Sequence, residues 1–239
     1  GAWPLDFTRD AATNTDSLQY NDGMNPGNRI AVGPDGTIFN VFQRLVSSQS
    51  GVKKLTYLIT VSNDGGTTWS VTNSDHLSGA RIIAADVYSF QGNGSKVGGV
   101  NALLGGIDAI AADPKTGAAW VVYGARATLT GHDQLYLVKV TFSAGDLTIG
   151  TPVLLTSSTI DNYLPSVAVL PNGEVGVLFL TLSGSTFTWR FAQYTNGITI
   201  VKTTDFPSFT SPFTNNGQAN QRILGDYVLN LADFKRRAV

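Results

Sequence analysis

Short runs of β-branched and aromatic residues recur along the chain, and each run is bounded by glycine, proline, asparagine or aspartate. Such runs are typical of β-strands. Helical periodicity with caps is hard to find, and the best helical candidate, GARIIAADVYSF at residues 79–90, fits a strand within a long loop equally well. The pattern therefore predicts an all-β protein. The predicted strands include TIFNVFQRL, KLTYLITV, AAWVVYGA, QLYLVKVTF, EVGVLFLTL and FTWRFAQY.

Three segments repeat one pattern, in which a short apolar strand leads through a turn with proline and glycine into a longer apolar strand. They are RIAVGPDGTIFNVFQ, AIAADPKTGAAWVVYG and SVAVLPNGEVGVLFL. A second hairpin follows each of these segments. In the first two units its position is nearly constant, since Ser62 and Ser143 lie at nearly the same distance after Ile30 and Ile110. Four strands in each repeat predict the four-stranded antiparallel blades of a β-propeller.

The repeats divide the chain into units that start near residues 29, 109 and 166, with an incomplete unit near 228. Residues 78–106 are rich in glycine and have no counterpart in the other units, so we expect an inserted loop there. Residues 1–28 form an N-terminal extension in which WPLDFT could add a strand.

Residues 29–239 are expected to hold about three to four blades, as three units and an incomplete fourth, and three and a fraction are too few for a typical propeller, which closes with about four to eight. An open fragment would expose unpaired strand edges. We therefore expect these blades to belong to a larger propeller, completed by another segment or by a second chain.

Composition narrows the class of partner. The chain is 42% hydrophobic and 14% charged, with a net charge of −1, so it offers no basic surface for nucleic acid or anionic membranes. It has no apolar run long enough for a membrane span. Its many Thr, Ser, Asn and Gly residues favour an extracellular or cell- or virion-surface location. We expect no cofactor and no metal, since His76 and His132 lack metal-ligand or catalytic-triad spacing and are expected to be loop residues.

One turn carries a recognisable motif. Ser62, Asp64, Gly66, Thr68 and Trp69 match the Asp-box pattern Ser-x-Asp-x-Gly-x-Thr-Trp, which resembles the sialidase-like (BNR-repeat) β-propeller family. We expect the aspartate to accept hydrogen bonds from turn amides, the glycine to adopt positive φ, and the tryptophan ring to pack on the neighbouring strands. In that family the motif lies away from the substrate face, so the resemblance implies fold rather than catalysis. A chance match in an ordinary hairpin is the alternative.

Three aspartates precede predicted innermost strands, in segments similar to those repeated in bacterial sialidase-like propellers. Asp108, Asp161 and Asp226 would then converge near the mouth of the central channel; Tyr227 follows the last of them. The favoured alternative is that each aspartate caps a loop by accepting backbone amides.

The resemblance implies a tyrosine nucleophile activated by glutamate, and three arginines that clamp a substrate carboxylate. Arg29 resembles the first of these arginines, although Ala31 stands where the family has proline; a surface arginine is the competing interpretation. No tyrosine–glutamate pair is identifiable, because the only glutamate, Glu174, follows a Pro-Asn-Gly turn. The candidates for the other arginines of the clamp are Arg44, Arg126, Arg190 and Arg222.

Phe206, Phe209 and Phe213 lie among proline and serine residues and predict an aromatic platform for sugar rings or a protein partner; the alternative is that they cover an open blade edge. Two functions follow. We favour a non-catalytic propeller module that binds a glycan or protein through loops at the channel mouth. The alternative is part of a sialidase-like exo-glycosidase whose site is completed by residues outside this chain.

Overall fold

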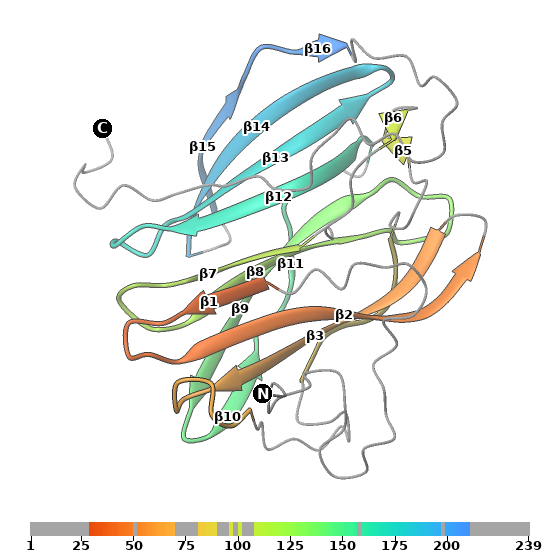
Figure 1. The fold of residues 1–239 in the computed structure, drawn as a ribbon. Coiled ribbons are helices and arrows are strands. Elements are labelled where there is room, and N and C mark those ends of the chain that lie inside the picture. Colours follow the sequence, from red (N-terminus) through yellow and green to blue (C-terminus); the bar gives the residue numbers. More distant parts are fainter. Residues whose placement is uncertain are drawn as a thin grey trace.

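A computed structural model of the protein describes residues 29–49, 52–69, 81–89, 96–97, 100–101, 108–156, 159–196 and 199–210. Every element of regular structure in these ranges is a strand. The strands form three consecutive antiparallel sheets that stack one above the other (Figure 1). The prediction of an all-β chain built from four-stranded propeller blades is confirmed.

The first blade has the strand order β1-β2-β3-β4. Its strands are β1 (Arg29–Val32), β2 (Ile38–Gln49), β3 (Val52–Ser62) and β4 (Arg81–Ser89). The two short strands β5 (Lys96–Val97) and β6 (Val100–Asn101) pair with each other outside this sheet.

Within the stretch 78–106, where we expected an inserted loop, residues 81–89 form the strand β4; of the two interpretations of GARIIAADVYSF, the structure shows the strand and not the helix. They pair antiparallel with β3, from Ile59 opposite Arg81 to Lys53 opposite Ser89. The side chain of Ile83 is buried in the core that joins the first two blades. Because β3 is long and already pairs with β2 on one side, the apolar residues of 81–89 complete the sheet on the other.

The second blade has the order β7-β8-β9-β10. Its strands are β7 (Asp108–Ala112), β8 (Ala119–Ala125), β9 (Gln134–Ser143) and β10 (Asp146–Ile149), and the short β11 (Val153–Leu154) also pairs with β9. The outermost strand is therefore made of two pieces.

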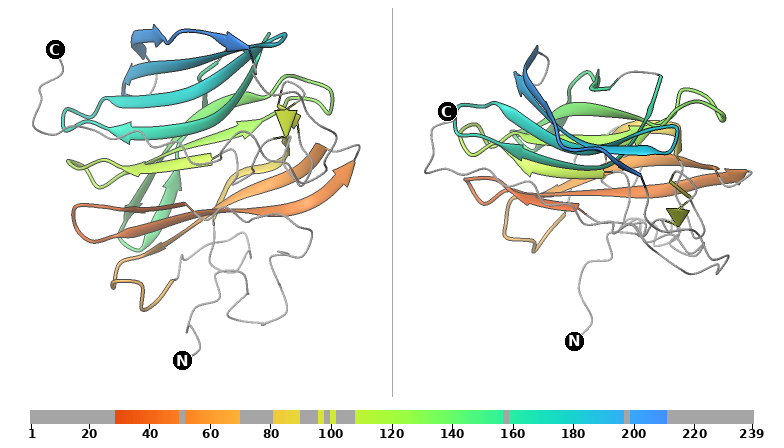
Figure 2. Two further views of the ribbon diagram at one scale, coloured as in Figure 1. Left: turned by 45° about the horizontal axis from the view of Figure 1, so that its top comes forward. Right: turned by 90° about the horizontal axis from the view of Figure 1, so that it is seen from above.

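The third blade repeats this plan in the order β12-β13-β14-β15. Its strands are β12 (Asp161–Val169), β13 (Val175–Ser183), β14 (Thr186–Thr195) and β15 (Thr199–Asp205), with β16 (Phe209–Thr210) also paired with β14. Seen from two further directions, the three sheets keep this stacked arrangement (Figure 2).

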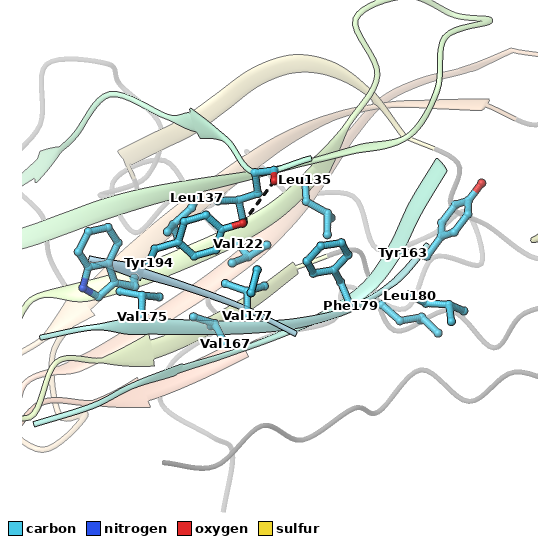
Figure 3. Packing of buried hydrophobic residues seen from close by; sticks show 14 of the residues in the cluster. Val122, Leu135, Leu137, Tyr163, Val167, Val175, Val177, Phe179, Leu180 and Tyr194 are labelled. Atoms are coloured by element: carbon cyan, nitrogen blue, oxygen red, sulfur yellow. Dashed lines mark hydrogen bonds between the residues drawn. The ribbon is translucent and has the colours of Figure 1, made fainter. Parts of the chain in front are cut away.

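Blade packing explains why β8 is an uninterrupted apolar run, since all seven of its residues are buried. Val121 and Tyr123 contribute to the core shared with the first blade, whereas Trp120 and Val122 contribute to the core shared with the third. Figure 3 shows the second core, where side chains of β13 and Tyr194 meet Val122, Leu135 and Leu137 of the second blade. A strand between two sheets has no face left for water.

The innermost strands β1, β7 and β12 lie side by side, one from each blade (Figure 1). We call the end of the sheets at which these three strands begin the start face, and the opposite end the turn face. The turns β1–β2, β7–β8 and β12–β13 lie on the turn face, as does the end of β3, where Ser62 pairs with Ile38.

Several predicted features lie outside the described residues: the extension 1–28, the incomplete unit near 228, Asp226, Tyr227 and Phe213. The part of the chain that the structure describes contains no helix long and apolar enough to cross a membrane.

Candidate functional site

The turn at residues 62–69 is held by one carboxylate. Thr68 donates its backbone amide to both oxygens of Asp64, at 2.9 and 3.0 Å, and its hydroxyl to Asp64 Oδ2 at 2.6 Å. The Ser62 hydroxyl donates to Asp64 Oδ1 at 2.8 Å and accepts the Gly66 amide at 2.9 Å. The φ angles of Gly65 and Gly66 are 73° and 87°, which favour glycine.

The same contacts explain the acidity of Asp64. Hydrogen bonds from the Thr68 hydroxyl, then from its amide, then from Ser62, lower the pKa of Asp64 to about 2. The indole nitrogen of Trp69 donates to the Gly66 carbonyl at 3.1 Å, so the half-buried ring closes the turn. The turn lies on the turn face, away from the residues described next.

Asp108 opens β7 at the start face, and its side chain is fully buried between the first two blades. Nε of Arg29 lies 3.7 Å from Asp108 Oδ1 and donates a hydrogen bond of 3.2 Å to the Asp108 carbonyl oxygen. Gln43 of β2 faces the same carboxyl, yet none of the four side-chain polar atoms of Gln43 and Asp108 makes a well-formed hydrogen bond. We call the region where two neighbouring blades pack together a seam. The seam between the first two blades therefore holds a buried carboxyl group whose oxygens accept no well-formed hydrogen bond.

Burial raises the pKa of Asp108 to about 7, although the Arg29 charge and the Gln43 amide act in the opposite direction. Near neutral pH the group is therefore partly protonated. The protonated form can donate a hydrogen bond, whereas the ionised form can only accept.

Asp161 opens β12 at the start face and reaches across to the loop between β8 and β9. Its Oδ1 accepts the Asp133 backbone amide at 2.8 Å and lies 3.2 Å from Nδ1 of His132. The side chains of His132 and Asp161 are 49% and 26% exposed. They form a polar pair at the surface, above the seam between the second and third blades.

Beneath this pair, Arg126 and Asp133 form a buried bidentate ion pair, with N···O distances of 2.7 and 2.8 Å. The Asp133 side chain is fully buried and that of Arg126 is 12% exposed. Burial raises the pKa of Asp133 above its usual value even though Arg126 acts to lower it. Burial, followed by the charges of Asp133 and Asp161, raises the pKa of Tyr163. Figure 3 shows the Tyr163 hydroxyl directed away from the other core side chains drawn.

The structure brings Asp108 and Asp161 to the same face but to different seams. Asp108 faces Arg29 and Gln43 between the first two blades, and Asp161 contacts His132 and Asp133 between the second and third. Asp161 accepts a backbone amide, as a capping residue does, whereas the Asp108 carboxylate accepts none.

The candidate clamp arginines are mostly engaged within the chain. Arg126 is held by Asp133, and Arg190 forms a bidentate pair with Asp205 at 2.6 and 2.7 Å. Arg29 contacts Asp108. The side chain of Arg44 and all of Arg222 lie outside the described residues.

Glu174 lies in the β12–β13 turn, on the turn face, where Gln193 Nε2 donates to its Oε2 at 2.5 Å. Asp161 is the first residue of β12, and the other eight residues of this strand separate it from the turn, a span of about 26 Å at ~3.3 Å per residue. The glutamate is therefore far from the polar groups of the start face.

Phe209, one of the three phenylalanines of the predicted platform, packs against the protein, as the alternative of a covered blade edge would have it. Its ring stacks on Phe187 with centroids 5.5 Å apart, and it packs against the core of the second and third blades. Phe206 is 47% exposed. Phe206 directly follows β15, the outermost strand of the third blade. Since β13 and β14 lie between β15 and the innermost strand β12, and neighbouring strands are about 4.8 Å apart, Phe206 lies well away from β12.

Sequence reasoning missed His132 and Asp133 as site residues. The signal was present in the segment Arg126–Asp133, which ends in His-Asp between two apolar strands. What the sequence did not reveal is that this loop lies against the start of β12. In the described ranges, no three His, Asp or Glu side chains gather as metal ligands.

No family model and no curated protein matches the chain. The solved structures that are similar to it at low identity include the following three. A protein of unknown function from Dyadobacter fermentans is 15% identical, with 78% of this chain and 50% of that chain covered and a TM-score of 0.47. The GH93 α-L-arabinofuranosidase of Fusarium graminearum is 12% identical, with 81% and 52% covered and a TM-score of 0.49. NanB sialidase from Streptococcus pneumoniae is 17% identical, with 64% and 19% covered and a TM-score of 0.36. The chain spans about half the length of the first two, and no residue role passes from these proteins to it.

Proposed function

We propose that the chain is a non-catalytic module of a sialidase-like propeller that binds a glycan through its start face. The observation that carries this proposal is the gathering of polar side chains from separate segments at one end of the sheets. Arg29 and Asp108 meet at one seam, and His132 and Asp161 meet at the next. A few convergent polar groups where sheets meet are typical of ligand sites.

The charged side chains that catalysis would need are remote or already paired within the chain, which favours binding over catalysis. The only glutamate of the chain lies on the turn face, so it does not activate a nucleophile at the start face. Arg126 and Arg190 are each held by an aspartate, so neither is free to clamp a substrate carboxylate without first losing that partner.

The second candidate is part of an exo-glycosidase whose site is completed outside this chain. It is favoured by Arg29, which opens the innermost strand of the first blade beside a carboxyl group with a raised pKa. Such an enzyme would need its nucleophile and activating glutamate from other blades.

Completion of the propeller is part of the proposal, whether by a further segment or by a second chain. Exposed apolar residues on the two outer blades support it: Ile30 and Val32 on β1, and Ile200 and Val201 on β15. A protein ligand at the start face is the competing occupant. An extracellular or cell- or virion-surface location is consistent with glycan binding.

Two assays on the purified chain separate these functions. The first measures binding to an array of neutral and sialylated glycans. The second measures hydrolysis of fluorogenic sialosides and arabinofuranosides. Binding without hydrolysis supports the module, whereas hydrolysis that is lost in Arg29→Ala supports the enzyme. Absence of binding to every glycan overturns the proposed glycan ligand.

A further inference from the structure

The hydrogen bonds around Asp161 determine which of its oxygen atoms is available. Oδ1 accepts both the Asp133 amide at 2.8 Å and a contact from His132 at 3.2 Å. Within the described part of the chain, Oδ2 makes no hydrogen bond. The side chain thus presents one unused acceptor at a surface position that is 26% exposed.

The same contact selects the tautomer of His132. A carboxylate oxygen has no proton to offer, so the neutral imidazole keeps its proton on Nδ1 and donates it to Asp161. Nε2 is then an acceptor, and it has no partner among the described residues. With a neutral imidazole, His132 and Asp161 therefore present two neighbouring acceptors.

The pair is held in place from below. The Arg126–Asp133 ion pair anchors the loop, and Asn162 donates its backbone amide to the Asp133 carbonyl at 2.9 Å. Arg126 also donates its backbone amide to the Tyr88 carbonyl of β4 at 2.7 Å. The loop is thus tied to all three blades, and its acceptors are positioned before any ligand arrives.

Charge limits what this pair can bind. The bidentate partner of the Arg126 guanidinium is Asp133, so the carboxylate of Asp161 is a further negative charge, placed near the surface. An acidic sugar would meet this charge with repulsion, whereas neutral hydroxyl groups would donate to both acceptors.

We propose that His132 and Asp161 form a subsite for two adjacent hydroxyl groups of a neutral glycan, and that this subsite disfavours sialylated glycans. The inference rests on the proposed glycan-binding function and names the substrate class. Each hydroxyl donates one hydrogen bond, the first to Asp161 Oδ2 and the second to His132 Nε2.

The test uses the full chain and calorimetric titration with the methyl glycoside of the neutral sugar that binds best on the array. Asp161→Asn keeps an oxygen for the Asp133 amide but replaces the second acceptor with a donor. His132→Phe keeps a planar ring and removes both nitrogens. Asp146→Asn, on the turn face, is the matched control. Melting temperatures establish that each variant is folded.

We expect Asp161→Asn and His132→Phe each to raise Kd at least about tenfold, which corresponds to about 1.4 kcal/mol, with Asp146→Asn unchanged. A glycoside that lacks one of the two hydroxyls should bind the wild type more weakly by the same factor. It should bind the variant that lacks the acceptor for that hydroxyl no more weakly than the complete glycoside does.

Wild-type affinity in both folded variants overturns the subsite while leaving glycan binding intact. Tighter binding of sialylated than of neutral glycans overturns the charge argument and the subsite with it. If the wild type binds no glycan, the proposed function and the subsite fail together.

Discussion

Arg29 and Asp108 join the first two blades at the beginning of their innermost strands, with Arg29 Nε 3.7 Å from Asp108 Oδ1 and 3.2 Å from the Asp108 carbonyl oxygen. The arginine contacts both the carboxyl and the backbone of its neighbour. The carboxyl nevertheless lacks well-formed hydrogen bonds, so this contact does not compensate fully for its burial.

The raised pKa of Asp108 predicts a pH-dependent stability. Because the folded value, about 7, lies above the unfolded value of 3.8, the folded state binds more protons, and stability is lost as pH rises from about 4 through 7. Asp108→Asn removes this loss and should raise the free energy of unfolding at pH 8 by up to about 4 kcal/mol, with little effect at pH 4. Urea unfolding at both pH values measures the difference. A variant that is less stable than wild type at pH 8 contradicts the assignment.

Asp64 should contribute to stability in the opposite pH range. Its pKa is lowered to about 2, so its contribution is present above pH 3.8 and disappears as pH falls toward 2. Asp64→Ala should lower Tm by a few °C at pH 6 and have little effect near pH 2. Hydrogen exchange at the Thr68 amide should accelerate in the variant. Equal exchange rates at pH 6 would show that the carboxylate does not hold the turn.

The Arg126–Asp133 pair predicts an asymmetric mutational response. Arg126→Ala leaves a buried charge on Asp133 and should cost about 3–5 kcal/mol at pH 7. The double variant Arg126→Met/Asp133→Leu removes both charges and should recover most of that loss. Chemical denaturation of the single and double variants tests this. If the double variant is no more stable than Arg126→Ala, the cost comes from lost packing and not from the unpaired charge.

Two buried tyrosines offer a matched comparison of the two seams. Tyr57 donates to the Gly124 carbonyl at 2.9 Å between the first two blades, and Tyr194 donates to the Leu155 carbonyl at 3.3 Å between the second and third. Tyr57→Phe should cost about 1–2 kcal/mol, and Tyr194→Phe should cost less because its bond is longer. Thermal unfolding of both variants ranks them, and the reverse order would contradict the geometry.

The sequence by itself determined the local features. Strand segments such as AWVVYGA follow from β-branched and aromatic runs, and the turn at Ser62–Trp69 depends on contacts within eight consecutive residues. The positions of Asp108 and Asp161 at the beginning of innermost strands also follow from the repeats. These features depend on neighbours in the chain, so their residue types are enough to predict them.

Only the tertiary structure decided which distant segments meet. Residues 81–89 pair with β3 because that strand has an open side, which no local pattern in 81–89 reveals. Asp161 reaches His132 and Asp133 because two blades pack face to face, and Arg126 is engaged because the same loop folds back on itself. Such contacts depend on the stacking of whole sheets, so the sequence supplied the candidate residues while the packing of the blades selected their partners.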